Sequence, residues 1–183
     1  FCFGVDRAVR LTYRLAAEGR RVATLGPLIH NDQCVADLAA KGVVTAGSVG
    51  SIPPGYEVVI RSHGVPAAVY DELAALGSPV HDATCPFVAK IHKIAREAQA
   101  AGAVLLVAGD SAHPEVQGIV GHTSGEVFVF ADLAELCGWN GPKKPDSSIF
   151  AVAQTTFQVT KWLECTKFLK KAYTNAKVFD TIC

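Results

Sequence analysis

Three cysteines have positions that suit the binding of a metal. Cys85 lies in the stretch HDATCPFVAK and has no second cysteine at CxxC spacing, which excludes a local dithiol pair or zinc knuckle. The stretch VHDATC, which ends at Cys85, has the same plan as VFDTIC, which ends at Cys183, and Cys2 comes about one such unit earlier. A repeated unit that directs one thiol each to a common centre would explain cysteines so far apart in the chain.

Several polar residues are predicted on the same rim as these cysteines. His30, His63 and His113 each follow a strand-like run and precede a helix start, and Glu115 and Thr155 follow such runs as well. Imidazolium, hydroxyl and helix N-terminal N–H groups all donate hydrogen bonds, so this rim suits an anionic, hydroxyl-bearing ligand. A phosphate group is the expected anion.

The remaining cysteines and histidines have ordinary structural interpretations. Three cysteines are expected to lie in helices: Cys34, Cys137 and Cys165. We expect these thiols to be small buried hydrophobic side chains. Three further histidines are expected to have surface or core roles, the last of them late in a helix: His81, His92 and His122.

Strands and helices alternate along the chain and would position these residues. Five short apolar runs are typical of buried strands, at 21–25, 56–60, 103–108, 126–130 and 148–153. Five stretches have apolar residues at three- and four-residue spacing and predict helices, at 6–18, 31–41, 66–76, 86–100 and 159–173. The alternation indicates an α/β fold with mostly parallel sheets, in which ligands bind beyond the carboxyl ends of the strands.

The two halves of the chain repeat one plan. Each contains a strand that leads to a histidine and a helix, then a strand that leads to a polar turn, a helix and a DxxC strand end. We therefore predict one small parallel-sheet α/β lobe at 1–85 and a second at 86–183, which would be two of three units around a pseudo-threefold axis. Because the sequence begins without methionine and ends directly after a strand-like run, we expect it to be part of a longer protein.

Composition narrows the classes of partner. The formal net charge is zero and no basic tract is present, which argues against binding to nucleic acid. No apolar run approaches the length of a membrane span, and no signal segment leads the chain. Since 50% of the residues are hydrophobic and suffice for a core, a disulfide framework is not needed, and we expect a cytoplasmic protein with reduced thiols.

Seven motifs, in order, resemble those of the 4-hydroxy-3-methylbut-2-enyl diphosphate reductase (LytB) family. They are FCFGVDRAV, GPLIHNDQCVADLAAKGV, SHGVPAAV, DATCPFVAKIH, HPEVQG, AQTTFQV and DTIC. The resemblance covers essentially the whole chain. Seven short motifs in the right order are highly specific, whereas any one of them would be weak.

The resemblance implies an enzyme with three α/β lobes around a central cavity, of which two lobes are present here. The cavity would hold a 4Fe-4S cluster on three cysteines, which are Cys2, Cys85 and Cys183 in this sequence. Three thiolates leave one iron open to the hydroxyl of an allylic diphosphate substrate. Two electrons from a donor such as ferredoxin or flavodoxin, with loss of water, would give isopentenyl or dimethylallyl diphosphate. This is the last step of the non-mevalonate pathway of isoprene biosynthesis.

The resemblance also implies roles for residues of the rim. Glu115 matches the carboxylate that delivers the proton, and Thr155 is expected to hold the substrate hydroxyl and its proton relay. His30, His63 and His113 match the histidines of the diphosphate pocket, and His113 is a candidate for proton delivery as well. The family's third lobe follows the third cysteine and supplies an asparagine and serines to the diphosphate. Because the sequence ends at that cysteine, we expect the chain alone to be impaired.

Other function classes remain open on the residues themselves. A non-catalytic iron-sulfur or zinc module would use Cys2, Cys85 and Cys183 with a histidine as fourth ligand, and it would not need Glu115. A nucleotide-binding α/β module is disfavoured, since the chain has no GxGxxG or Walker-type glycine loop. A structural fragment without a ligand is the third alternative.

Overall fold

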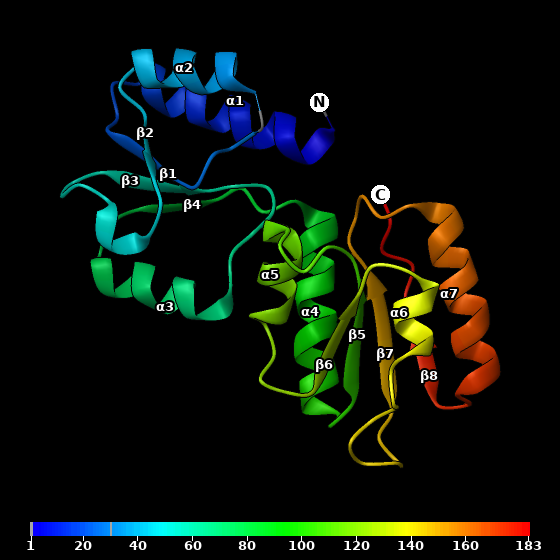
Figure 1. Cartoon of the computed structure of the whole chain (residues 1–183). Helices are drawn as coiled ribbons and strands as arrows, with labels where there is room; N and C mark the ends of the chain where they lie inside the picture. Colours follow the sequence, from blue (N-terminus) through cyan, green and yellow to red (C-terminus); the bar gives the residue numbers. More distant parts are fainter. Residues whose placement is uncertain (1, 30) are drawn as a thin grey trace. The chain divides into compact units, whose positions relative to one another are not determined.

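Two compact units make up the chain, as Figure 1 shows. The computed structural model describes residues 2–29 and 31–183, so the predicted site residue His30 lies outside the described residues. The units are Phe1–Pro86 and Phe87–Cys183, a division one residue away from the boundary expected from the repeat. Both are built from parallel strands and helices, which confirms the predicted α/β class.

The first unit is a four-stranded parallel sheet. Its strands have the spatial order β2-β1-β3-β4, with bounds β1 Val22–Leu25, β2 Val44–Ala46, β3 Glu57–Ile60 and β4 Val80–Asp82. Its helices are α1 Phe3–Ala17, α2 Asp32–Ala40, the short 3-10 helix η1 Val49–Ser51, and α3 Ala67–Leu76. Because the strand pairs are parallel, the carboxyl ends of the strands share one edge of the sheet.

The second unit repeats this order with β6-β5-β7-β8. Its strands are β5 Val104–Ala108, β6 Val127–Phe130, β7 Ile149–Ala153 and β8 Ala176–Val178. Its helices are α4 Pro86–Ala100, α5 Pro114–Val120, α6 Leu133–Cys137 and α7 Val159–Ala172. In both units the strand order is that of the second, first, third and fourth strand, so the sequence repeat corresponds to a repeat of topology.

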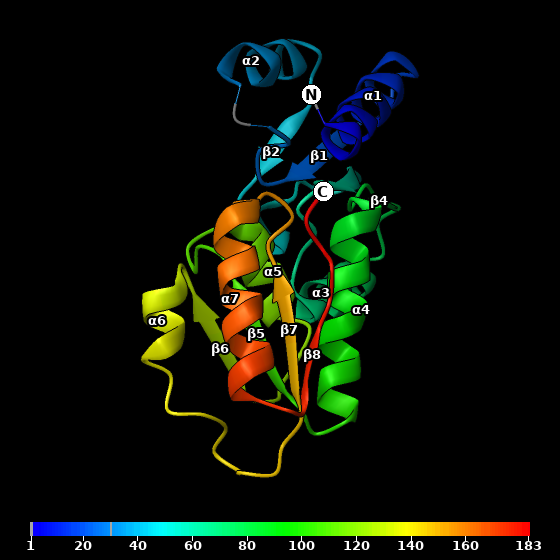
Figure 2. The same ribbon diagram turned by 90° about the vertical axis from the view of Figure 1, so that its right-hand side faces the viewer.

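Helices cover both faces of each sheet, which is why the central strands β5 and β7 are apolar at every position and β1 has only Thr24 as a polar residue. In β5, Leu105 and Val107 pack with α4 and α5, whereas Leu106 and Ala108 pack with α6 and α7. Figure 2 shows α4 and α7 on opposite sides of this sheet. The first unit has the same plan, with α1 and α2 on one face and η1 and α3 on the other.

The helices bury one stripe each, as their sequence spacing predicts. In α1 the buried residues include Gly4, Ala8, Thr12 and Leu15, which lie one turn apart on the face toward the sheet. The Thr12 hydroxyl donates to the Ala8 carbonyl at 2.9 Å, which satisfies the polar group inside this stripe. The stripe sets the rotation of α1 and so the direction of the residues at its N-terminal end.

Two expectations about single residues are wrong. His122 does not lie in a helix, because α5 ends at Val120 and Gly121 follows as its C-cap. Cys137 is exposed rather than buried, because α6 is a short helix that buries the neighbouring Leu136 and turns the next position outward. Cys165 in α7 is fully buried, as expected, and Cys34 in α2 is half-buried.

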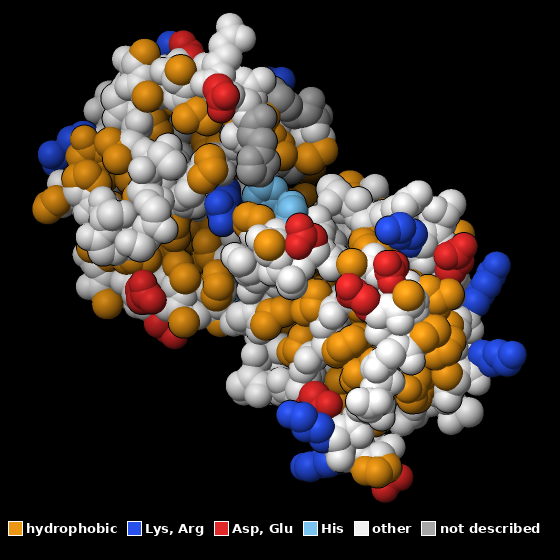
Figure 3. Space-filling view, in the orientation of Figure 1, with side chains coloured by type: hydrophobic (Ala, Val, Ile, Leu, Met, Phe, Trp, Pro, Cys, Tyr) orange, Lys and Arg blue, Asp and Glu red, His pale blue; other side chains and the backbone are white. Residues whose placement is uncertain are grey.

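Charged side chains of both signs are scattered over the surface shown in Figure 3. On the face shown in Figure 3, Lys and Arg side chains are interspersed with Asp and Glu. Some pair along helices, such as Arg10 with Asp6 in α1 and Lys93 with Glu97 in α4. Exposed pairs of this kind contribute little to stability, which therefore depends mainly on the apolar layers.

Within residues 2–29 and 31–183, no helix combines the length and the apolar character that crossing a bilayer requires.

Candidate functional site

A buried carboxyl group, Glu115, lies in the first turn of α5 in the second unit. Its side chain is 2% exposed. The Thr155 N–H donates to its Oε1 at 2.6 Å, and the Thr155 hydroxyl donates to its Oε2 at 2.8 Å. The two residues are 40 positions apart and follow the neighbouring strands β5 and β7. The fold thus brings together two residues that the sequence predicts at the site.

Opposing effects act on the Glu115 carboxyl. Burial raises its pKa above the ordinary value for glutamate, while the two hydrogen bonds from Thr155 and the nearby His113 lower it, and burial prevails. A carboxyl group with a raised pKa retains its proton closer to neutral pH. Glu115 therefore has the property that a general acid needs.

His113 forms the N-cap of α5 and contacts the same turn. Its Nδ1 accepts a hydrogen bond from the Glu115 N–H at 3.1 Å. Because Nδ1 is the acceptor, this bond assigns the proton of the neutral ring to Nε2. Pro114 follows at the first helical position, where the lack of an N–H costs nothing. The cap fixes the ring relative to the carboxyl two residues away.

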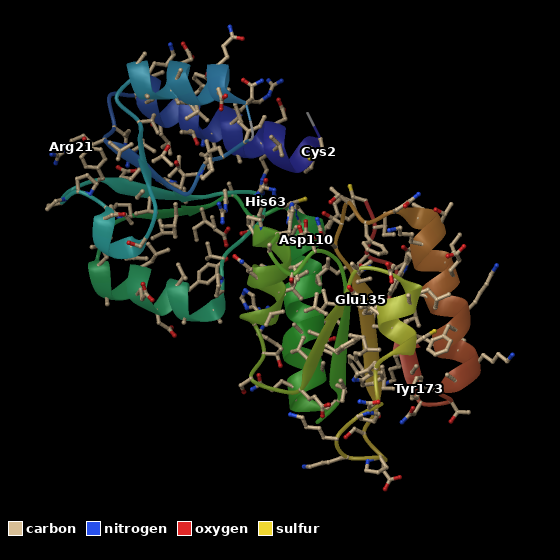
Figure 4. The ribbon with its side chains drawn as sticks, in the orientation of Figure 1. Cys2, Arg21, His63, Asp110, Glu135 and Tyr173 are labelled. Carbon is tan, nitrogen blue, oxygen red and sulfur yellow. The ribbon has the colours of Figure 1, made fainter. Side chains whose placement is uncertain are left out.

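Gln154 joins the two strand ends from which these residues come. Its Oε1 accepts from the Asp110 N–H at 3.3 Å, and its Nε2 donates to the Thr156 hydroxyl at 2.9 Å. Asp110, which Figure 4 labels, follows β5. A Cβ atom at Gly109 would lie 3.0 Å from the same Oε1, so the backbone must approach closely here. This bridging role is not apparent from sequence, although Gln154 directly follows a predicted strand.

The backbone of Cys183 is hydrogen-bonded to that of Thr155. Its N–H donates to the Thr155 carbonyl at 2.9 Å. The Thr181 hydroxyl, two residues earlier, donates to the Ala153 carbonyl at 2.8 Å and accepts from the Ala153 N–H at 2.9 Å. These bonds hold the DTIC segment along the end of β7. Thr155 therefore contacts Glu115 with one set of groups and the Cys183 backbone with another.

Cys85 has an equivalent position in the first unit. Its N–H donates to the Ser62 carbonyl at 2.9 Å. The Asp82 carboxylate accepts from the Thr84 N–H at 2.8 Å and from the Thr84 hydroxyl, and its second oxygen accepts from the Tyr70 hydroxyl at 3.0 Å. An aspartate that bonds its own backbone two residues on forms a tight turn. The turn presents Cys85 beyond the end of β4, with its thiol half-buried.

Cys2 directly precedes α1, the helix that packs on the same turn. It is the N-cap residue of α1, and its thiol is exposed. A Cβ atom at Gly4 would lie 2.7 Å from the Cys85 sulfur, so only glycine allows this approach without a shift. The Arg7 guanidinium donates to the Thr84 carbonyl at 2.9 Å. The first turns of α1 are therefore packed directly on the DATC turn.

His63 is the third residue after β3, and its side chain is half-buried. Figure 4 labels it and Cys2, both in the first unit. The Gly64 N–H donates to the Arg61 carbonyl at 3.0 Å and closes the turn, with Gly64 at a φ of 69° that favours glycine. The turn directs the chain from β3 into α3.

The predicted site residues fall into two groups. The first unit contributes Cys2, His63 and Cys85, and the second contributes His113, Glu115, Thr155 and Cys183. All six cysteines, each within the described residues, are free thiols. Within 2–29 and 31–183, no three or more His, Cys, Asp or Glu side chains are gathered so that they could hold a metal ion.

The cysteines outside these groups differ in environment. Burial raises the pKa of the Cys165 thiol to about 11, so this side chain remains a neutral core residue. Cys34 lies 3.9 Å from the Tyr13 hydroxyl, which donates to Asp37 at 2.7 Å. Cys137 is exposed on α6. They belong to helix faces, whereas the DxxC cysteines follow strand ends.

Sequence comparison finds similarity along the whole chain. The family model described as LytB protein matches residues 1–183. The 4-hydroxy-3-methylbut-2-enyl diphosphate reductase of Wolinella succinogenes is 38% identical over 184 residues, which cover 100% of this chain and 64% of the relative. The enzyme of the same name from Solidesulfovibrio magneticus is 36% identical and is covered over 66% of its length. The chain thus spans less than two thirds of the length of either relative.

Solved structures give the same picture of the fold. One, of (E)-4-hydroxy-3-methyl-but-2-enyl diphosphate reductase, the terminal enzyme of the non-mevalonate pathway, has a TM-score of 0.86 at 34% identity and covers 100% of this chain and 65% of that one. A second, the E-1-hydroxy-2-methyl-but-2-enyl-4-diphosphate reductase from Plasmodium falciparum, has a TM-score of 0.89 at 21% identity, with 58% of that chain covered. The second similarity concerns the fold alone.

Proposed function

The chain belongs to the LytB protein family, and from this premise we propose that the full-length protein is a 4-hydroxy-3-methylbut-2-enyl diphosphate reductase. In the proposed reaction, the substrate takes up two electrons and two protons, its C–O bond breaks, water leaves, and isopentenyl or dimethylallyl diphosphate forms. The observation that carries the proposal is the buried Glu115 held by Thr155, whose carbonyl in turn accepts from Cys183. Through Thr155, this arrangement links the proposed proton donor Glu115 to Cys183 of the DxxC repeat.

The proposed cofactor is a 4Fe-4S cluster held by Cys2, Cys85 and Cys183. The donor chemistry fits, because all three are free thiols and thiolates are the usual ligands of such clusters. Cys2 and Cys85 directly precede α1 and α4, and the partial positive charge at a helix N-terminus favours anionic groups. When bound, such a cluster supplies electrons and a Lewis-acidic iron for the substrate hydroxyl.

The proposed acid is Glu115. Its raised pKa favours the protonated form, and the two bonds from Thr155 fix the plane of its carboxyl group. The Thr155 hydroxyl, which contacts Oε2, is suited to holding the substrate hydroxyl and passing the proton. His113 keeps its Nε2 proton because Nδ1 accepts from the backbone, so it is suited to donate to an oxygen of the substrate.

The proposed diphosphate ligands are His30, His63 and His113, of which the last two are half-buried side chains that follow strand ends. Such ring nitrogens can donate to phosphate oxygens. The electrons would come from a small redox protein such as ferredoxin or flavodoxin. We expect the enzyme to act in the cytoplasm, where thiols stay reduced.

The direct test is an anaerobic assay of the full-length protein with substrate and a reductant. Glu115→Gln should keep its iron and sulfide but lose turnover by about 100-fold or more, the usual cost of losing a general acid. Gln still accepts from the Thr155 N–H, so the fold is kept. Glu164→Gln, at an exposed position of α7, is the matched control and should be active. Turnover of Glu115→Gln at the control rate would contradict the role of the carboxyl, and an inactive wild-type protein would contradict the function.

A further inference from the structure

Each DxxC turn receives a hydrogen bond from a cation on a helix. In the first unit, Arg7 Nη2 donates to the Thr84 carbonyl at 2.9 Å and to the Asp82 carbonyl at 3.5 Å. In the second unit, Lys90 Nζ donates to the Asp180 carbonyl at 3.1 Å. The acceptors are backbone carbonyls within the segments DATC and DTIC. Neither contact is expected from the sequence, since the partners are 77 and 90 residues apart.

The two cations occupy equivalent positions. Arg7 is the fifth residue after Cys2, and Lys90 is the fifth residue after Cys85. Their helices, α1 and α4, both precede the first strand of a sheet and pack on the equivalent face. In each unit, the helix that follows one cysteine therefore reaches the turn that carries the next. Two independent contacts of the same kind, at the same spacing, argue against a chance surface bond.

We propose that Arg7 and Lys90 are positioning residues that hold the DxxC turns, and with them Cys85 and Cys183, in the arrangement that binds the cluster. This inference rests on the proposed function. Hydrogen bonds from a charged donor are stronger than neutral ones, so each cation restricts its turn before any metal binds. Changing residues that orient metal ligands typically costs about 10–100-fold in metal affinity or activity.

In the first unit, two contacts from α1 hold the DATC turn: the bond from Arg7 and the packing of Gly4. Gly4, which packs on the Cys85 sulfur, and Arg7 lie one turn apart on α1 and act on the same segment. In the second unit, the residue at the position of Gly4 is Phe87, which is 45% exposed. There Lys90 acts with Thr181, whose hydroxyl bonds to Ala153.

The chain offers a matched control for each cation. Arg10 and Lys93 lie on the same two helices, and their side chains are 79% and 71% exposed. Each pairs with an acid on its own helix, Arg10 with Asp6 and Lys93 with Glu97. Loss of these charges changes the helix surface without touching a DxxC turn.

The test uses the full-length protein with its cluster assembled anaerobically. Variants Arg7→Ala and Lys90→Ala are compared with Arg10→Ala and Lys93→Ala by the rate at which a chelator removes iron. We expect about tenfold faster loss for Arg7→Ala and about threefold for Lys90→Ala, whose bond is single and exposed, and no change for the controls. Arg7→Lys, which retains a charged donor, should restore most of the wild-type rate.

A second measurement does not depend on iron. Amide hydrogen exchange in the cluster-free protein should be faster at Cys85 in Arg7→Ala and at Cys183 in Lys90→Ala, with the rest of each unit unchanged. If Arg7→Ala and Lys90→Ala match the control variants in both the rate of iron loss and amide exchange, the inference is overturned. The proposed function would still stand in that case, provided that the wild-type protein is active. If wild-type protein takes up no iron, the cofactor proposal fails, and unchanged exchange at the two cysteines would then overturn the inference as well. A uniform rise in exchange, which reports general destabilisation, would also overturn it.

Discussion

The two units share a strand order, but different hydrogen-bonding groups hold the middle of their DxxC segments on the sheet. In the first unit, the Ala83 N–H donates to the Ile60 carbonyl at 3.0 Å, a bond between backbones. In the second, Thr181 stands at the position of Ala83, and its hydroxyl both donates to and accepts from Ala153. A backbone contact in one unit is thus replaced by a side chain in the other. The position of the segment is common to both, whereas the means of holding it are not.

The contact of the cysteine itself is the same in both units. Cys85 donates to the Ser62 carbonyl and Cys183 to the Thr155 carbonyl, both at 2.9 Å. Each acceptor is the second residue after the third strand of its sheet, β3 or β7. The cysteine backbone therefore lies at one defined place on each sheet edge. This place, rather than the side chains around it, is what the two units have in common.

The largest effect should come from Thr181→Val in the second unit. Valine keeps the shape but leaves the N–H and carbonyl of the buried Ala153 without the hydroxyl. We expect the free energy of unfolding to fall by about 2–4 kcal/mol, measured by urea denaturation. Thr84→Val, which removes a hydroxyl bonded to the exposed Asp82, should cost about 1 kcal/mol. Equal losses would mean that the side-chain contact is not what fastens the second segment.

A smaller effect is expected for Gly4→Ala in the first unit. The added Cβ would lie 2.8 Å from the Cys85 Cβ, so the helix or the turn must shift. Overpacking usually costs about 1–3 kcal/mol, partly offset by the better helix propensity of alanine. Phe87→Ala at the equivalent exposed position should change the urea midpoint little. A Gly4→Ala protein as stable as wild type would show that α1 is not packed against the DATC turn as described.

The buried carboxyl of Glu115 in the second unit should make the free energy of unfolding depend on pH. Because the pKa of Glu115 is raised in the folded state, its contribution to stability is present below the unfolded glutamate value of about 4.3 and is lost as the pH rises through the folded value. Glu115→Gln has no such loss. Urea denaturation should therefore favour the variant over wild type more at about pH 7 than at about pH 4. A difference independent of pH would contradict the raised pKa.

The smallest effect is expected at Glu57 in the first unit, where the contribution to stability should change with pH in the direction opposite to that of Glu115. Bonds from His81 at 2.7 Å and Arg20 at 2.6 Å lower the pKa of its carboxyl. Its contribution is present above the unfolded glutamate pKa of about 4.3 and is lost as the pH falls through the lower folded value. The advantage of wild type over Glu57→Gln should thus shrink between about pH 6 and pH 3. An advantage that grows with acid would contradict this pairing.

Sequence reasoning succeeds where burial dictates residue type. The strands β1, β5 and β7 are buried along their whole length; β5 and β7 are continuous apolar runs and β1 has Thr24 as its one polar residue, so the sequence pattern predicts all three. By contrast, β2 has three residues with Thr45 exposed, too short a signal to predict. The exposure of Cys137 is also beyond prediction, because it depends on how the short α6 is rotated against its sheet.

For the candidate site, the sequence indicates which residues matter but not how they meet. The DxxC repeat marks Cys85 and Cys183 as equivalent, and their identical backbone contacts agree with that. The bonds from Thr155 to Glu115 depend on β5 and β7 being neighbours, which nothing local in either segment specifies. The contact of Arg7 with the DATC turn likewise requires the packed helix.

The central claim is that the three cysteines set at repeat positions hold a cluster and the three on helix faces do not. The most direct test is the iron and acid-labile sulfide content of the full-length protein, purified anaerobically, with each cysteine changed to serine in turn. We predict near-complete loss of iron in three variants: Cys2→Ser, Cys85→Ser and Cys183→Ser. Full iron content is predicted in Cys34→Ser, Cys137→Ser and Cys165→Ser. An unchanged iron content in Cys85→Ser, or zinc in place of iron in the wild-type protein, would contradict the account.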